Sequence, residues 1–127
     1  MNIIGGEKRG SKLALCASKA VRPTAQRTRE ALFNILQGGR FSLSLSEATV
    51  IDLFAGTGAI GLEALSRGAR SCVFVERDQD ALQTLQANIS KLKLENCAHI
   101  LAKDARQIHS WRGPAADLVF ADPPYSS

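Results

Sequence analysis

The chain has 127 residues, of which 45% are hydrophobic and 22% are charged, and its formal net charge is +4 at pH 7. That length and composition fit one globular domain and exclude disordered, collagen-like and membrane-spanning proteins, since no apolar run approaches the ~20 residues of a membrane helix. The three cysteines include no CxxC pair, which excludes a disulfide scaffold and argues against a zinc site, so we expect a cytoplasmic protein without a metal.

Positive charge is concentrated at the start of the chain. Residues 1–40 contain eight lysines and arginines against two acidic residues, whereas residues 41–127 contain eight basic and ten acidic residues. A basic segment beside a near-neutral body suggests contact with a polyanion, although a solvated, solubilising surface explains the charge equally well. We therefore predict two units, a basic N-terminal arm and helix over 1–40 and a second unit over 41–127.

The first unit is predicted to form an extended segment followed by a helix. Residues 1–22 alternate weakly and contain three glycines, which favours an arm or a hairpin. Thr24 is a plausible N-cap for a helix that continues to about Gln37 and is stopped by two glycines. This helix is expected to bury the apolar side chains of Leu32, Phe33, Ile35 and Leu36.

Short apolar runs alternate with helical segments in the second unit. The predicted strands are 49–54, 72–76, 99–102 and 116–121. One helix is predicted over 62–67, and Asp78 caps a second helix whose leucines and isoleucine recur at spacings of three and four. The alternation predicts an α/β fold, in which a parallel sheet carries helices on both faces.

A glycine-rich turn follows the first predicted strand. The segment from Gly56 through Gly58 to Gly61 has the pattern G-x-G-x-x-G, and Glu76 follows its first glycine by twenty positions at the end of the next strand. This is the nucleotide-binding arrangement of a βαβ unit, in which backbone N–H groups bind an anion and the acidic residue accepts from ribose hydroxyls. The alternative, a merely tight strand–helix turn, fits this context less well.

Asp52 is a carboxylate inside the first apolar strand. A charge there is costly unless it is paired, so we expect it to face a cation or a donor at the carboxyl end of the sheet. A diphosphate would be repelled by Asp52, whereas a ligand that carries an ammonium group and a sulfonium would be attracted.

The tetrapeptide Asp122-Pro123-Pro124-Tyr125 directly follows the fourth predicted strand. Open α/β sheets place their active sites at the carboxyl ends of their strands. Consecutive prolines restrict the backbone, so the Asp122 carboxylate and the Pro123 carbonyl can act as two converging acceptors beside the Tyr125 ring. This arrangement suits a planar base with an exocyclic amino group, although an ordinary turn is the simpler alternative.

The chain resembles the class I S-adenosylmethionine-dependent methyltransferases with an Asp-Pro-Pro-Tyr motif, and within them the bacterial 16S ribosomal RNA guanine-N2 methyltransferase family, type D. The likeness spans nearly the whole chain in the family's order. It is carried by Ile3-Ile4-Gly5-Gly6, Arg22-Pro23-Thr24, Arg29-Glu30-Ala31-Leu32-Phe33-Asn34-Ile35-Leu36, Asp52-Leu53-Phe54-Ala55-Gly56-Thr57-Gly58, Gly61-Leu62-Glu63-Ala64-Leu65-Ser66-Arg67-Gly68-Ala69, Val75-Glu76, Asp104-Ala105 and Asp122-Pro123-Pro124-Tyr125.

The resemblance implies a Rossmann-like fold and assigns roles to residues on both sides of the predicted site. S-adenosylmethionine would be held at its methionine end by Asp52 and the backbone of Gly56 and Gly58, at its ribose by Glu76, and at its adenine by Asp104 with Ala105. By itself, Asp104 could equally be a helix N-cap. The base would be held by Asp122, Pro123 and Tyr125.

The resemblance also gives the basic N-terminal unit a partner, either 16S rRNA or the small ribosomal subunit. Arg22, Arg27 and Arg29 would contact phosphates. Arg29 has an alternative, which is an ion pair with an acidic residue of its own fold. The family likeness further implies a monomer that uses no metal and no membrane.

Three alternatives remain open at this point: an adenine-N6 methyltransferase acting on DNA or RNA, a nicotinamide-dependent dehydrogenase, and a non-catalytic RNA-binding relative. The resemblance implies that the four predicted strands are ordered 3-2-1-4, which would leave the fourth as a bare apolar edge and an aggregation hazard. Class I methyltransferases complete this sheet with three more strands. We therefore expect the chain to be a fragment of a longer enzyme, truncated after its fourth strand.

Overall fold

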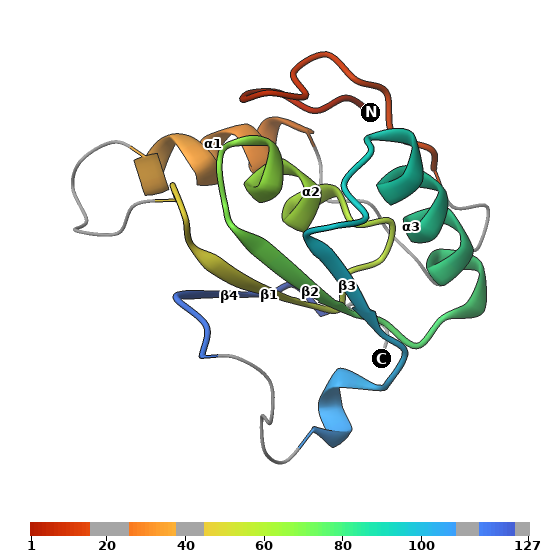
Figure 1. Ribbon diagram of the computed structural model, residues 1–127. Coiled ribbons are helices and arrows are strands. Elements are labelled where there is room, and N and C mark those ends of the chain that lie inside the picture. The colour runs from red at the N-terminus through yellow and green to blue at the C-terminus, as the bar shows by residue number, and fades with distance from the viewer. Residues whose placement is uncertain (16–25, 38–44, 109–114, 124–127) are drawn as a thin grey trace.

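A computed structural model describes residues 1–15, 26–37, 45–108 and 115–123. Four parallel strands form one sheet in the order β3-β2-β1-β4 (Figure 1). The strands are β1 (Thr49–Leu53), β2 (Ser71–Val75), β3 (Ala98–Leu101) and β4 (Leu118–Ala121). The α/β class, the parallel sheet and the strand order predicted from the sequence are confirmed.

Three α-helices, α1 (Gln26–Gln37), α2 (Ala59–Ser66) and α3 (Gln79–Lys91), pack on one face of this sheet (Figure 1). The short 3₁₀ helix η1 (Ala105–Gln107) follows β3. The expected helices on both faces are therefore not found in the part of the chain that the structure describes. The steps from β1 to β2 and from β2 to β3 run in one direction, and right-handed crossovers then place α2 and α3 on the same side.

Most predicted boundaries are accurate to within one or two residues, but α2 begins at Ala59, three residues earlier than predicted. Gly58 is its N-cap, so the second half of the glycine pattern belongs to the helix. Asp78 caps α3 as predicted, and its carboxylate accepts from the N–H of Ala81 at 2.9 Å. None of the helices in the described residues is long and apolar enough to cross a membrane.

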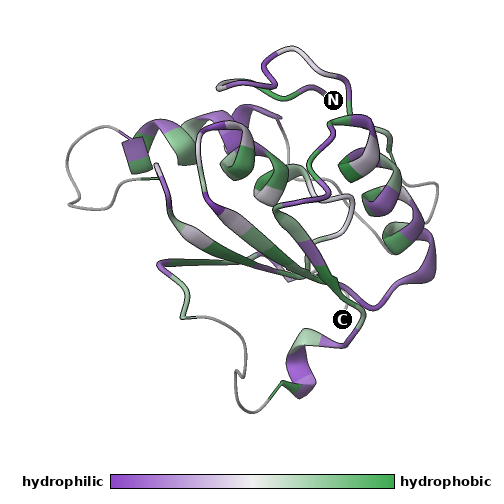
Figure 2. Ribbon diagram, viewed as in Figure 1, coloured by the Kyte–Doolittle hydropathy of each residue, from purple (hydrophilic) through white to green (hydrophobic). Residues whose placement is uncertain are grey.

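The core lies between the sheet and the three helices. The strand register places Val50, Cys72, Phe74 and Phe120 on the helix-covered face, and all four are buried. Figure 2 shows this apolar interior, with hydrophilic residues on the outer sides of the helices. Gly61 lets α2 approach the sheet closely, because a Cβ there would lie 2.3 Å from Phe74 Cε1.

Helix α1 contributes a narrower apolar side than predicted. Phe33 is fully buried, and its ring packs 5.7 Å from that of Phe120. Leu32 and Leu36 are partly buried against the core, but Ile35 is 56% exposed. The prediction for Ile35 was wrong because the buried stripe of α1 is centred on positions 29, 33 and 36, and position 35 lies ~100° further around the helix from position 36.

The N-terminal arm is a small hairpin. Asn2 and Lys12 form an antiparallel bridge, and the N–H of Ile3 donates to the carbonyl of Ser11 at 2.9 Å. The arm packs against the C-terminal end of α2, where Gly6 has φ +77° and a Cβ would lie 1.9 Å from the carbonyl oxygen of Ser66. The predicted hairpin is thus present, and a glycine is required where it meets the helix.

Candidate active site

Acidic side chains gather where the four strands end. Asp52 lies within β1, Glu76 follows β2 directly, Asp104 lies three residues after β3, and Asp122 follows β4 directly. Because the strands are parallel, these residues lie along the same edge of the sheet. This is the edge at which open α/β sheets bind their ligands, and β4 adjoins β1 where the strand order reverses.

The loop between β1 and α2, residues 54–58, is called the glycine loop below and has an unusual backbone. Phe54, Gly56 and Gly58 all have positive φ, at 58°, 58° and 89°. A left-handed conformation is uncommon for a bulky residue such as phenylalanine, and it clusters at functional sites. A Cβ on Gly58 would lie 2.4 Å from the Cδ1 of Leu85, so a side chain there would have to displace Leu85 as well as adopt a positive φ.

Asp52 is a buried carboxylate that lacks an ion pair among the described residues. Its side chain is 2% exposed, and its Oδ2 accepts from the N–H of Gly61, in the first turn of α2, at 3.1 Å. Burial raises the pKa of Asp52 to about 7; the Gly61 hydrogen bond opposes this shift, and the negative charges of Asp122 and Glu76 add to it. The sequence predicted a donor or cation beside Asp52, and the structure provides the donor.

Glu76 connects the end of β2 to the glycine loop. Its Oε1 accepts from the N–H of Gly56 at 2.8 Å, and its Oε2 accepts from the backbone N–H groups of Arg77 and Asp78 at 3.0 and 2.9 Å. A carboxylate has about four acceptor positions, so these bonds leave room for about one further donor. The Gly56 amide, which the sequence analysis assigned to ligand binding, donates to Glu76 instead.

Asp104 begins the short helix after β3. Its Oδ1 accepts from the N–H of Arg106 at 3.0 Å, which makes it the N-cap of η1, and Ala105 is the first residue of that helix. Its Oδ2 forms an exposed ion pair with Arg77 at 3.2 Å. The N-cap alternative is therefore found, and two acceptor positions of the carboxylate are occupied without preventing a further contact.

Asp122 and Pro123 are exposed at the end of β4. The β1–β4 register pairs Leu53 with Ala121, so Asp122 lies next to the start of the glycine loop. Its charge also contributes to the raised pKa of Asp52, which lies on the adjacent strand. Tyr125, the predicted stacking residue, lies outside the described residues.

The predicted RNA-contacting arginines separate into different environments. Arg27 is exposed on α1, as a phosphate contact requires, and Arg22 lies outside the described residues. Arg29 is 0% exposed and forms an ion pair with Glu63, with 3.3 Å between Arg29 Nε and Glu63 Oε1. Burial lowers the pKa of Arg29, and the charge of Glu63 opposes that shift. Arg29 thus follows its alternative, an internal ion pair, and the phosphate-contact interpretation is corrected.

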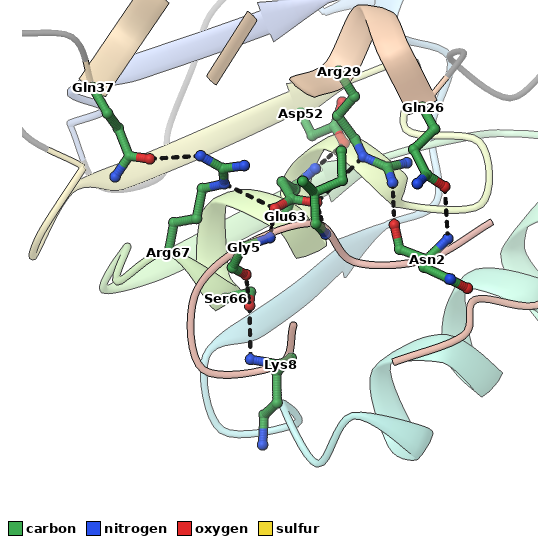
Figure 3. A network of polar contacts seen from close by, with 12 residues as sticks. Asn2, Gly5, Lys8, Gln26, Arg29, Gln37, Asp52, Glu63, Ser66 and Arg67 are labelled. Atoms are coloured by element: carbon green, nitrogen blue, oxygen red, sulfur yellow. Dashed lines mark hydrogen bonds and ion pairs between the residues drawn. The ribbon is translucent and has the colours of Figure 1, made fainter. Parts of the chain in front are cut away.

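Glu63 is the centre of a buried polar network (Figure 3). Its two carboxylate oxygens accept from the N–H groups of Ile4 and Gly5, both at 2.9 Å, and its Oε2 lies 2.8 Å from Arg67 Nε. Together with Arg29, these contacts join the arm, α1 and α2 at one side chain. The guanidinium of Arg29 also donates to the carbonyl of Asn2.

Several polar residues of the site region have roles that the sequence did not reveal. Arg77 pairs with Asp104, and the guanidinium of Arg106 lies 5.7 Å from the centre of the Phe54 ring. Asn88 is buried on α3 and bonds to the glycine loop. Of these residues, only Asn88 could have been recognised from the sequence, because it is a polar residue on the apolar helix stripe that carries Leu85 and Leu92.

The cysteines and acidic residues show no metal centre within the described ranges. No group of three or more His, Cys, Asp or Glu side chains there could hold a metal ion. Cys72 and Cys97 are free thiols, and burial raises the pKa of both. They are therefore poor nucleophiles and are best explained as core residues.

The β3-β2-β1-β4 sheet, the glycine loop and the acidic strand ends define a Rossmann-like fold of the class I methyltransferase type. The solved structure of yhhF from Escherichia coli superposes with a TM-score of 0.83 at 37% sequence identity, covering 98% of this chain and 64% of that one. The hypothetical protein TTHA0928 of Thermus thermophilus superposes with a TM-score of 0.69 at 36% identity, covering 84% of this chain and 57% of that one.

The chain belongs to the family described as conserved hypothetical protein 95, whose model matches residues 1–127. It is 40% identical over 125 residues to Ribosomal RNA small subunit methyltransferase D of Escherichia coli (strain K12), covering 98% of this chain and 60% of that protein. It is 34% identical over 128 residues to the protein of the same name from Haemophilus influenzae, covering 98% of this chain and 64% of that protein. The chain therefore spans about three fifths of the length of these relatives.

Proposed function

We propose that this chain is the cofactor-binding part of an S-adenosylmethionine-dependent methyltransferase that modifies the exocyclic N2 of a guanine in 16S rRNA. The observation that carries the proposal is Asp52, a buried carboxylate beside the glycine loop that has no cationic partner among the described residues. A buried charge of this kind is costly in isolation and is favoured by a cationic ligand. The names of the relatives support the small-subunit rRNA as the substrate.

The residues present fit S-adenosylmethionine part by part. Asp52 would attract the ammonium and sulfonium groups of the methionine end. Glu76, which retains about one free acceptor position, would accept from one ribose hydroxyl, and Asp104 would accept from the adenine amino group. The loop backbone at Gly58 would contact the methionine end of the ligand.

When bound, S-adenosylmethionine supplies a methyl group on a positively charged sulfur. The Asp122 carboxylate and the Pro123 carbonyl would accept the two hydrogens of the guanine amino group, and Tyr125 would stack on the ring. This contact would orient the nitrogen lone pair toward the methyl carbon, so that an N–C bond could form as the S–C bond breaks. The nitrogen then loses a proton to solvent, so no strong base is required. A paired guanine must first be flipped out of its helix.

The basic N-terminal unit would bind the rRNA backbone through exposed cations. Arg27 remains a candidate phosphate contact because its side chain is exposed, and Arg22 remains a candidate on sequence grounds alone. Arg29 is not part of this proposal. The complete enzyme would act as a monomer in the cytoplasm, without a metal.

The proposal is tested with the complete protein, undermethylated small ribosomal subunits and S-adenosylmethionine carrying a labelled methyl group. We expect label at N2 of a single guanine of 16S rRNA. We also expect that Asp122→Ala abolishes turnover while cofactor binding is retained. Label on adenine N6 would overturn the guanine assignment, and tight binding of NAD without binding of S-adenosylmethionine would overturn the methyltransferase assignment.

A further inference from the structure

Asn88 is a buried side chain of α3 that connects two segments far apart in the sequence. It is 1% exposed, and its Oδ1 accepts from the N–H of Ala14 in the arm at 2.7 Å. Its Nδ2 donates to the carbonyl of Ala14 at 3.3 Å and to the carbonyl of Thr57 in the glycine loop at 3.0 Å. One amide group therefore bonds to the arm and to the loop at the same time.

The Thr57 carbonyl lies at the most restricted part of the loop. Thr57 is 3% exposed and stands between Gly56 and Gly58, both of which have positive φ. A hydrogen bond to that carbonyl fixes the orientation of the peptide group between Thr57 and Gly58. Leu85, one turn before Asn88 on α3, packs against the position where Gly58 has no Cβ. Helix α3 thus holds the loop in its shape.

The arm has a second attachment that does not involve the loop. Near its start, Ile4 and Gly5 donate to Glu63, and the N–H of Lys8 donates to the hydroxyl of Ser66 at 2.8 Å (Figure 3). These contacts lie on the middle and C-terminal end of α2. Among the arm contacts of the described residues, the one through Asn88 reaches the glycine loop. It holds the part of the arm that leads into the basic stretch containing Lys19 and Arg22.

We propose that Asn88 is a positioning residue that couples docking of the arm to the conformation of the glycine loop. A docked arm holds the Asn88 amide by two hydrogen bonds, so that its remaining N–H stays directed at Thr57. Because coupling between two binding events is reciprocal, a ligand that stabilises the loop also stabilises the docked arm. The inference takes the identity of that ligand, S-adenosylmethionine, from the proposed function.

The first experiment needs no ligand. Amide hydrogen exchange is measured at Gly56 and Gly58 in the complete protein and in two arm variants. Ala14→Pro removes the N–H that donates to Asn88, and Ser66→Ala removes the hydroxyl that accepts from Lys8. We expect Ala14→Pro to speed exchange at the loop amides severalfold and Ser66→Ala to leave it unchanged. Equal loop exchange in the two variants would overturn the coupling.

The second experiment adds S-adenosylmethionine, measured by calorimetry and by exchange at the Ala14 amide. We expect the ligand to slow exchange at Ala14 in the unmodified protein. Asn88→Ala removes all three hydrogen bonds of this side chain, and we expect it to bind the ligand about tenfold more weakly because the loop loses the one bond it receives at Thr57. Ile89→Ala shortens the neighbouring buried side chain on α3, which forms no hydrogen bond because it is a hydrocarbon, and controls for a general loss of stability.

The outcomes separate the two proposals. If the unmodified protein fails to bind S-adenosylmethionine, the proposed function fails, while the ligand-free exchange still decides the coupling. If it binds and Asn88→Ala binds equally well, or if Ile89→Ala weakens binding as much as Asn88→Ala does, the positioning role of Asn88 is wrong.

Discussion

Two buried carboxylates of this chain, Glu63 and Asp52, differ sharply in the number of polar groups that contact them. Glu63 is 0% exposed and is contacted by two backbone N–H groups and two arginine side chains. Asp52 is 2% exposed and has one hydrogen bond, from the N–H of Gly61, with no ion pair among the described residues. The two residues lie on adjacent elements, β1 and α2, so general burial does not explain the difference.

The contacts of the two carboxylates separate a charge that is compensated within the fold from one that a cationic ligand could compensate. Glu63 is compensated by its own fold and joins the arm, α1 and α2. Asp52 is left with a pKa raised to about 7, at the edge of the sheet where the glycine loop begins. Strongly perturbed titratable groups in such positions are candidates for function, whereas compensated ones belong to the scaffold.

The largest effect is expected from Glu63→Gln, which removes the charge that compensates buried Arg29. Removing one partner of a buried ion pair costs about 3–5 kcal/mol, because the other charge remains buried without compensation. The free energy of unfolding, measured with urea, should fall by that amount. Glu30→Gln, on the exposed side of α1, is the matched control and should have little effect. A loss in Glu63→Gln no greater than in the control would contradict the structural role.

Asp52→Asn should have the opposite effect: it should weaken ligand binding without lowering the free energy of unfolding. Hydrogen bonds and contacts to a charged group contribute about 1.5–3 kcal/mol, so the affinity for S-adenosylmethionine should fall about 10- to 100-fold at pH 8. The free energy of unfolding should not decrease, because a costly buried charge has been removed. Calorimetry and urea unfolding measure the two quantities. Asp80→Asn, on the exposed surface of α3, is the control, and unchanged affinity in Asp52→Asn would remove the distinction from Glu63.

The pH dependence of stability sharpens the same comparison. The pKa of Asp52 is about 7 in the folded state against an ordinary 3.8, so the native state holds a proton that the unfolded chain has released between these values. The resulting stabilisation is full below the lower pKa and is lost as the pH rises through about 7, with a slope of at most about 1.4 kcal/mol per pH unit. Unfolding at pH 5 and pH 7.5 should show this slope in the unmodified protein. Asp52→Asn should lack it, and an equal slope in both proteins would refute the assignment to Asp52.

The smallest effect concerns the arginines of α1, where the same contrast recurs between exposed Arg27 and buried Arg29. Arg27→Ala should change stability by less than about 0.5 kcal/mol, as surface substitutions usually do. It should reduce the slope of log affinity against log salt for rRNA by about one, because one phosphate contact is lost. Filter binding over a range of salt concentrations tests this, and an unchanged slope would exclude Arg27 from the RNA interface.

Much of the fold was predictable because it depends on local patterns. The apolar runs and the residues between them predicted four parallel strands, and Asp78 was identified as a helix cap. The order β3-β2-β1-β4 came from the resemblance to class I methyltransferases, and the structure confirms it. The positions of Asp52, Glu76, Asp104 and Asp122 at the strand ends followed from the same pattern. Placing all three α-helices on one face could not be derived from the alternation alone, because it depends on the direction of each crossover.

The sequence by itself determined the class of the fold and which residues stand at the strand ends, since strands and the turns that follow them are set by hydrophobic periodicity and turn residues. Only the tertiary structure decided what each charge does there. Arg27 and Arg29 are both arginines of α1, yet Arg29 is buried and pairs with Glu63 of α2, whereas Arg27 is exposed. Glu63 and Asp52 are both buried acids, yet one meets the arm and two arginines while the other meets a single amide. Compensation of a charge depends on contacts between distant segments, and local sequence does not encode those distances.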